Sequence, residues 1–325
     1  MRTARRIVSG VLVLSLVAGG WFAFINRQWI ADYLSVQQFT ASEPIAQLAG
    51  RSGMSEKGEF YFYASHPRVV DADEFNTACE RRERTSPILG CYVSSTNRIF
   101  VYDVQNAELD GIKEVTAAHE MLHVAYARLS QSDIDWLEPR LEAAYQRLRT
   151  DKLDQRMNYY ASAQPGSRLN ELHSILPTEF YDLGPELEEY YARYFANRRA
   201  VVDFHEQYSH VFYQLEDESQ ALAERLEGDL ARINTDSASY AAEVTALNQA
   251  IVAFNTRASS GYFSSQADFT QARSQLVARS SQLETERNAL DARIDEYNTN
   301  VERLNALGAK IDRLNKSIDS FEGIQ

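Results

Sequence analysis

The sequence predicts an α+β domain with a membrane-spanning helix before it and a long helical hairpin after it. Three observations support this prediction. Residues 7–25 are apolar and uncharged, strand-like runs between residues 59 and 104 give way to helical patterns, and the composition becomes that of a coiled coil from about residue 201. The predicted parts are a cytoplasmic tail (1–6), an anchor (7–25), a helical stalk (26–58), the α+β domain (59–200) and the hairpin (201–325).

The uncharged run at residues 7–25 is about as long as a helix that crosses a bilayer. Arg2, Arg5 and Arg6 precede it, and this positive charge predicts a cytoplasmic N-terminus. The alternative is a cleaved signal peptide, for which Val17-Ala18-Gly19 is a poor cleavage site. Because the apolar run continues past that point, the sequence favours an uncleaved single-pass anchor in the cell membrane. The rest of the chain is then extracytoplasmic.

Charge and cysteine content narrow the class of protein further. The chain has 325 residues and a formal net charge of −13, which argues against a nucleic-acid partner because phosphate binding needs a basic face. Cys79 and Cys91 are the only cysteines. A pair in an oxidising compartment usually bonds, and a loop this short would stabilise the fold by about 3 kcal/mol. The alternative, two metal ligands, lacks the short cysteine spacing of such sites. A disulfide is expected.

The segment before residue 105 is predicted to contain a short helix, then strands. Ser42 and Pro44 have the residue types of a helix cap and first turn, and Gly50 and Gly53 end that segment. The later elements are predicted from aromatic and β-branched runs separated by turn residues. They are strands at Glu59–Ala64, Cys91–Ser94 and Arg98–Val104, a turn at Ser95-Thr96-Asn97, and a helix at Asp71–Cys79.

Four helices are predicted between residues 110 and 200 from apolar spacing and from capping residues. Asp110 can cap the first, Ser130 or Ser132 the second, and Pro177 is expected to end the third. Their predicted bounds are about Asp110–Leu129, Asp133–Arg149, Leu169–Leu176 and Pro185–Tyr194.

The last part of the chain has a heptad pattern. Apolar residues recur every seven positions at Leu276, Leu283, Leu290, Tyr297, Leu304, Ile311 and Ile318. A similar spacing precedes Gly261, where the chain can reverse. An antiparallel hairpin about 80 Å long is favoured over a parallel oligomer, and a protein partner is a possible role for it. His205 and His210 are five apart, about 140° around a helix, so they are interpreted as part of its solvated start.

His119 and His123 are the residues that point to a chemistry. On a helix, residues four apart point the same way, so the two imidazoles can bind one metal ion. Glu120 lies beside them, placed to take a proton from metal-bound water. The residues that flank the motif from Thr116 to Ala125 are uncharged, as a buried catalytic helix requires. The alternative is two hydrogen-bonded histidines on an apolar helix face.

This segment resembles the HExxH motif of the zincin superfamily of metallopeptidases, and the strand hairpin before it also fits. The resemblance implies a Zn²⁺ ion held by His119, His123 and a third ligand. It also implies an edge strand that pairs with an extended peptide, and Arg98–Val104 would take that role. The third histidine of metzincins is absent, because residues 124–130 contain neither Gly nor His.

A downstream glutamate is therefore expected as the third ligand. Asn170-Glu171-Leu172-His173-Ser174 resembles the helix that supplies this ligand in gluzincins, so Glu171 is favoured, with Glu179 and His173 as alternatives. His173 is also a candidate to hydrogen-bond the oxyanion or a ligand. Tyr159, Tyr160 and Tyr181 could fill that role equally, and the sequence does not choose among them.

The predicted function is a membrane-anchored zinc metallopeptidase that hydrolyses a protein or peptide substrate, with Glu120 as general base. The alternative is an envelope scaffold or adaptor that acts through its coiled coil and has a structural or degenerate zinc site. Metal stoichiometry and the Glu120 carboxylate distinguish the two. A structural zinc site usually has four protein ligands and needs no general base.

Overall fold

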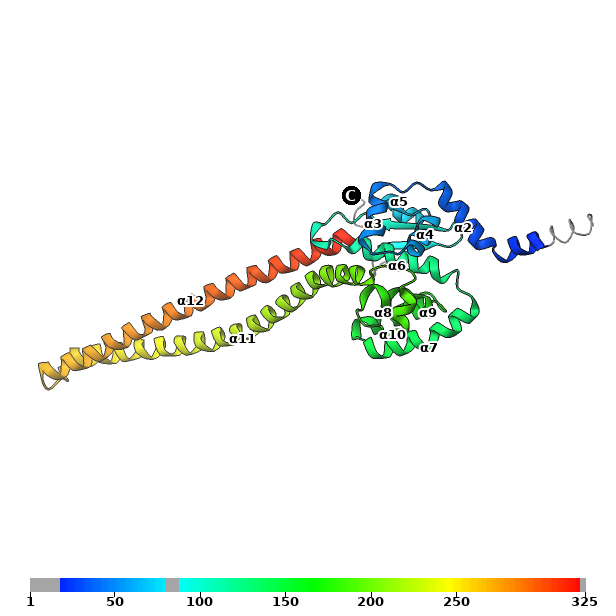
Figure 1. Ribbon diagram of the computed structural model, residues 1–325. Helices are drawn as coiled ribbons and strands as arrows, with labels where there is room; N and C mark the ends of the chain where they lie inside the picture. Colours follow the sequence, from blue (N-terminus) through cyan, green and yellow to red (C-terminus); the bar gives the residue numbers. More distant parts are fainter. Residues whose placement is uncertain (1–17, 80–87, 322–325) are drawn as a thin grey trace, which may run out of the picture. The chain divides into compact units, whose positions relative to one another are not determined.

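The computed structural model describes residues 18–79 and 88–321, and this part of the chain is predominantly helical (Figure 1). The predicted α+β, zincin-like class with a transmembrane helix is therefore wrong for these residues, which contain three short strands. The elements are α2 (Arg27–Gln38), α3 (Glu43–Arg51), α4 (Glu56–Ala64), β1 (Arg68–Val70), α5 (Ala72–Ala78), β2 (Gly90–Val93), β3 (Arg98–Tyr102), η1 (Ala107–Leu109), α6 (Ile112–Tyr126), α7 (Gln131–Leu148), α8 (Asp151–Ala163), α9 (Arg168–Glu179), α10 (Pro185–Tyr191), α11 (Arg198–Ser259) and α12 (Gln266–Ile318).

The prediction of a single-pass membrane protein is corrected for the part of the chain that the structure describes. Among those residues, no helix combines the length and the apolar character needed to cross a bilayer. The predicted cytoplasmic tail (1–6) and most of the predicted anchor (7–25) fall on residues 1–17, which lie outside the described residues.

The chain divides into two compact units, one formed by residues up to Val211 and from Leu314 onward, the other by Phe212–Arg313. The first unit contains the sheet, whose order is β1-β3-β2. β1 runs parallel to β3, and β2 pairs with β3 in the antiparallel sense through the turn that the sequence predicted. Because β3 is central, the predicted edge role of Arg98–Val104 is wrong. β2 is the edge strand on that side.

The aromatic run Glu59–Ala64 is a helix, although its composition predicted a strand. The Ser55 hydroxyl caps α4 by accepting a hydrogen bond from the backbone N–H of Gly58. Phe62 is fully buried in the core. Burial of such a side chain stabilises the fold by about 1.5–3 kcal/mol, which outweighs the weaker preference of aromatic residues for strands.

Helix α6 lies at the centre of the first unit. It packs against α3, α4, β2 and β3 on one side and against α9 on the other (Figure 1). The residue before its first turn is Gly111, with a φ of 93°, rather than the predicted cap Asp110, which pairs with Arg51. Met121 and Leu122 are fully buried. The motif helix is therefore held rigidly from several directions.

The helices after α6 follow the prediction in part. A capping box between Ser130 and Asp133 starts α7, as expected, whereas α8 was not predicted. Pro177 does not end the third predicted helix, because α9 continues to Glu179. A proline cannot donate to the carbonyl four residues earlier, here that of His173, and the Tyr191 hydroxyl donates to this carbonyl instead.

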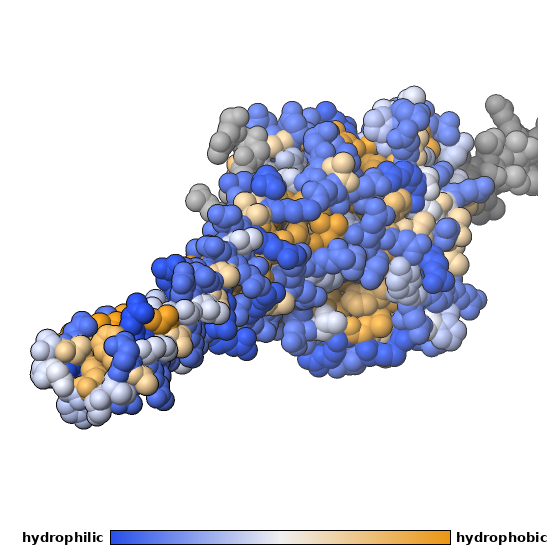
Figure 2. Space-filling model, turned by 90° about the vertical axis from the view of Figure 1, so that its left-hand side faces the viewer, coloured by the Kyte–Doolittle hydropathy of each residue, from blue (hydrophilic) through white to orange (hydrophobic). Residues whose placement is uncertain are grey.

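The second unit is the helical hairpin formed by most of α11 and α12. Cross-helix ion pairs join Arg225 to Glu296, Asp236 to Arg293 and Glu218 to Arg303, so the two helices run antiparallel. The loop between them contains Gly261 with a φ of 68°. The hairpin surface is mainly hydrophilic, with apolar side chains gathered near its loop (Figure 2). Supercoiling of the two helices stays a prediction.

The expected disulfide between Cys79 and Cys91 is present. It joins the end of α5 to the edge strand β2. Cys91 also lines the cleft described next.

Candidate metal centre

The two motif histidines lie one helical turn apart on α6 and open into a cleft. Their Nε2 atoms are 3.1 Å apart. The side chains of His119 and His123 are 18% and 13% exposed, so both reach the cleft while most of each ring is packed. The cleft has a volume of about 490 Å³. This is the arrangement that the i, i+4 spacing predicted.

Helix α9 brings Glu171 to the same point from 48 residues further along the chain. Its Oε2 atom lies 3.8 Å from His119 Nε2 and 3.9 Å from His123 Nε2. This oxygen is buried, and no donor among the described residues hydrogen-bonds it. A buried carboxylate oxygen without a partner is costly, so the arrangement calls for a cation.

The three atoms fit a zinc ion by distance. A triangle with sides of 3.1, 3.8 and 3.9 Å has a point about 2.1 Å from each corner. Zinc binds imidazole nitrogen and carboxylate oxygen at about 2.0–2.2 Å. Two nitrogens and one oxygen beside an open cleft also match the composition of catalytic zinc sites, which keep one position for water.

Two further side chains of α9 contact the histidines, and one of them orients the ring that it contacts. Asn170 Oδ1 lies 3.0 Å from His123 Nδ1 and accepts its hydrogen, which leaves the Nε2 lone pair facing Glu171. Ser174 Oγ lies 3.3 Å from His119 Nε2. Asn170 and Ser174 are one turn apart, on the same face of α9 as Glu171. One helix therefore supplies the carboxylate and holds the histidine ring in place.

Glu120 lies against the edge strand β2. Its carboxylate accepts a hydrogen bond from the backbone N–H of Tyr92. A methyl group added to Gly90 would lie 2.8 Å from Glu120 Cγ and 2.5 Å from Thr116 Cγ2, so only glycine leaves room for this approach. Burial, followed by the charge of Glu171, raises the pKa of Glu120 to about 8.

The other titrating groups are shifted for the same reason. Burial raises the pKa of Glu171 to about 7, although the charge of Arg156 opposes the shift. Burial lowers the pKa of both His119 and His123. Neutral imidazoles are the form that binds metals, so the histidines are already in the ligand state at neutral pH.

His173 and Glu179, the alternative third ligands, are bound to other side chains and not placed beside His119 and His123. His173 is fully buried with Nε2 3.0 Å from the Tyr190 hydroxyl, and it does not line the cleft. Glu179 does line the cleft, but both of its oxygens bind the Arg156 guanidinium, at 2.8 and 2.5 Å. His205, interpreted from sequence as solvated, lies 3.5 Å from Glu179.

The three candidate tyrosines differ in whether they line the cleft. Tyr159 and Tyr160 line the cleft, whereas Tyr181 is exposed and donates to Asp203. Burial raises the pKa of Tyr160, and the charge of Glu171 raises it further, so its hydroxyl stays protonated and can donate. The charge of Glu120 adds to the same shift, and Tyr160 lines the same cleft as both carboxylates.

Sequence reasoning missed the roles of Asn170, Gly90, Tyr92 and Arg156. Asn170 had a usable signal, because it directly precedes Glu171 and lies one turn before Ser174. The other three had none, since their positions depend on how β2 and α8 pack against α6 and α9. Comparisons with protein-family models, with curated proteins and with solved structures found no match to this chain.

Proposed function

We propose that this protein is a zinc-dependent peptidase whose metal ligands are His119, His123 and Glu171. The observation that carries the proposal is the buried, unpartnered Oε2 of Glu171 beside two imidazole nitrogens. The alternative third ligand, Glu179, is already bound by Arg156 through both oxygens. Glu171 is thus the better ligand.

The chemistry of the cleft divides between the metal and the side chains. A bound zinc ion lowers the pKa of water and polarises a substrate carbonyl. Glu120 would accept a proton once a bound cation offsets the burial and the Glu171 charge that raise its pKa, and the backbone N–H of Tyr92 holds its carboxylate beside the histidines. The protonated hydroxyl of Tyr160 donates a hydrogen bond to negative charge that develops on the substrate. Asn170 keeps the His123 ring oriented.

The edge strand β2 supports a peptide as the substrate. The Leu89 carbonyl accepts a hydrogen bond from the backbone N–H of Tyr102 in β3. The backbone N–H and C=O groups of the odd-numbered residues of β2 therefore point toward β3. Gly90 and Tyr92 face the opposite way, toward Glu120. No other described strand pairs with this outer edge. The Tyr92 N–H on this edge is bound to Glu120, so an extended peptide can add through the remaining backbone groups of the edge, with its backbone beside the general base.

The rival reading, a structural zinc site in a scaffold protein, receives less support. Structural sites are usually closed by four protein ligands, whereas three donor atoms converge here beside an open cleft. A structural site also gives no reason for a buried Glu120 with a raised pKa next to a ligand.

Zinc content and peptide cleavage by the full chain test the proposal together. Elemental analysis should find one zinc per chain, lost in His123→Ala and Glu171→Gln but kept in Glu179→Gln. Glu120→Gln should keep its zinc and lose about 10²–10⁴-fold in the rate of cleaving a peptide library. The exposed Glu189→Gln is the matched control and should behave as wild type. Wild-type cleavage by Glu120→Gln would refute the assigned role.

A further inference from the structure

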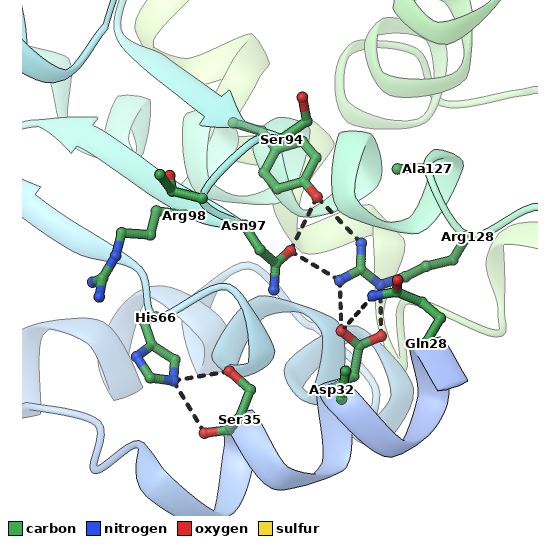
Figure 3. A pocket seen from close by; sticks show the side chains of 12 residues that line it. Gln28, Asp32, Ser35, His66, Ser94, Asn97, Arg98, Ala127 and Arg128 are labelled. Atoms are coloured by element: carbon green, nitrogen blue, oxygen red, sulfur yellow. Dashed lines mark hydrogen bonds and ion pairs between the residues drawn. The ribbon is translucent and has the colours of Figure 1, made fainter. Parts of the chain in front are cut away.

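A second cavity continues the cleft past the end of β2. It has a volume of about 510 Å³, and Tyr92, Ser94 and Ala127 line both cavities. Helix α2 forms its other side (Figure 3). A peptide that adds to the outer edge of β2 and runs on past Val93 therefore enters this cavity.

The floor of the second cavity is a buried ion pair that has no hydrogen bond left for a ligand. Arg128 binds both oxygens of Asp32, and the two side chains are only 6% and 2% exposed (Figure 3). Its remaining N–H groups bind Asn97 Oδ1, the Val124 carbonyl and the Tyr92 hydroxyl. All five donors of the guanidinium are used. This pair shapes the cavity and holds the end of the β2–β3 hairpin.

Arg98 is the charged side chain of this cavity that remains available to bind a ligand. It begins β3, its side chain is exposed, and no described residue forms an ion pair or hydrogen bond with its guanidinium. Since Asp32 neutralises Arg128, Arg98 is the uncompensated charge among the lining residues. His66 and Arg98 also line a third cavity of about 380 Å³, together with Arg68 and Val69 of β1, so the Arg98 side chain lies between two cavities.

The distance along β2 places Arg98 relative to the reacting bond. Gly90 lies beside Glu120, and Val93 pairs with Arg98 across the hairpin. At about 3.3 Å per residue, the end of β2 is about three residues from the general base. Antiparallel pairing is the more stable mode, and it puts the N-terminal side of the peptide at this end.

We propose that this second cavity binds an acidic side chain of the substrate, about three or four residues before the cleaved bond. The inference rests on the proposed peptidase function. Arg98 contacts the substrate carboxylate, and the Asp32–Arg128 pair positions the wall against which the peptide lies. The protein is thereby selective for extended peptides with Asp or Glu at one position on the N-terminal side.

The test compares peptides that differ only in having Glu, Ala or Lys at each position before the cleaved bond. Wild type should show a kcat/KM ratio of Glu to Lys peptide of about two- to fivefold at one of the proposed positions, the range expected for an exposed charge pair. Arg98→Glu should invert that ratio. Arg273→Glu, an exposed arginine on α12, is the charge-matched control and should keep the wild-type ratio. A wild-type ratio near one, or one that Arg98→Glu leaves unchanged, overturns the proposal.

Binding separates this inference from the peptidase proposal. The fluorescence anisotropy of the labelled Glu and Lys peptides is measured with full-length Glu120→Gln, alone and combined with Arg98→Glu. Tighter binding of the Glu peptide by Glu120→Gln, lost in the double variant, supports the acidic subsite. This holds even if wild type cleaves no peptide, because absence of cleavage would overturn only the peptidase proposal. Equal binding of both peptides overturns the subsite. So does an acidic preference on the C-terminal side of the bond.

Discussion

Two carboxylates are buried in neighbouring cavities of this protein, and their surroundings differ. Asp32 is 2% exposed and accepts hydrogen bonds from Arg128 and from Gln28. Glu171 is 5% exposed, and its Oε2 accepts no hydrogen bond from the described residues. Its nearest nitrogens belong to His119 and His123, whose pKa values are lowered so that neither carries a positive charge at neutral pH.

The difference separates a charge that the fold pairs from a charge that the fold leaves without a partner. The Asp32–Arg128 pair satisfies its own hydrogen bonds, so nothing remains for a ligand to supply. Burial of the ionised Glu171 carboxylate costs free energy that no hydrogen bond to Oε2 offsets. Its raised pKa reflects this cost. Burial alone does not mark a functional carboxylate. Burial without a compensating partner does.

The largest expected effect is on the free energy of unfolding, and it differs between substitutions of Asp32 and of Glu171. Asp32→Ala leaves the Arg128 guanidinium buried and unpaired, which should lower the free energy of unfolding by about 3–5 kcal/mol. Glu171→Gln removes an uncompensated charge, so in chelator-treated protein it should leave the free energy unchanged or raise it. Chemical denaturation measures both.

The exposed pair of Arg147 and Asp182 provides the matched control for that experiment. Asp182 is 77% exposed, and Asp182→Ala should change the free energy of unfolding by about 0–1 kcal/mol. If Asp32→Ala and Glu171→Gln destabilise chelated protein equally, the contrast between the two carboxylates is wrong.

The pH dependence of stability is the second test. The pKa of Glu171 is raised to about 7 in the folded state, so the folded state favours its protonated form. That contribution is complete below the unfolded pKa of about 4.5 and is lost as the pH rises through about 7. Between about pH 5 and pH 8, chelated wild type should lose about 2 kcal/mol more unfolding free energy than Glu171→Gln.

Zinc is the control for the pH experiment. The metal binds the ionised carboxylate, so saturating zinc should abolish or reverse the loss of stability in wild type at high pH. Glu171→Gln should respond little to the same zinc. A wild type whose pH dependence is the same with and without zinc speaks against Glu171 as a ligand.

Local signals predicted the parts of the fold that local interactions decide. The spacing of His119 and His123 predicted one helix face, and Ser130 predicted the start of α7 because a capping box is a local structure. The run Glu59–Ala64 was predicted wrongly because burial of Phe62 decided its structure. No pattern within six residues reveals which neighbour will cover an aromatic side chain.

The sequence could not predict the parts of the site that depend on packing between distant segments. Glu171 was favoured through a resemblance to a known motif, and only the packing of α9 on α6 separates it from Glu179. Asp32 and Arg128 are far apart in the chain, and neither has a neighbour that marks it. Gly90 is a glycine because β2 approaches Glu120, a contact invisible before the sheet is assembled.

Asn170→Ala is expected to have an intermediate effect, because Asn170 contacts a proposed zinc ligand, His123, without being one itself. Loss of the acceptor for His123 Nδ1 frees the ring to rotate and to change tautomer. Zinc affinity should fall by about 10–100-fold, the range found for such partners, with little change in stability. Competition with a chelator of known affinity measures it. Asn170→Asp, which restores an acceptor, should recover most of the loss.

The smallest effect is expected at Gly90, where a change outside the proposed metal ligands should alter only the proposed general base, Glu120. A methyl group there would crowd Thr116 Cγ2 and Glu120 Cγ, and the carboxylate side chain is the easier of the two to displace. Gly90→Ala should therefore keep its zinc and lose about tenfold in kcat, since small displacements of a proton acceptor are costly. Gly228→Ala on α11, where an added methyl meets nothing, is the matched control. Thr116→Ser removes the Cγ2 methyl and should restore part of the activity of Gly90→Ala. A Gly90→Ala variant with wild-type kcat would show that β2 does not position Glu120.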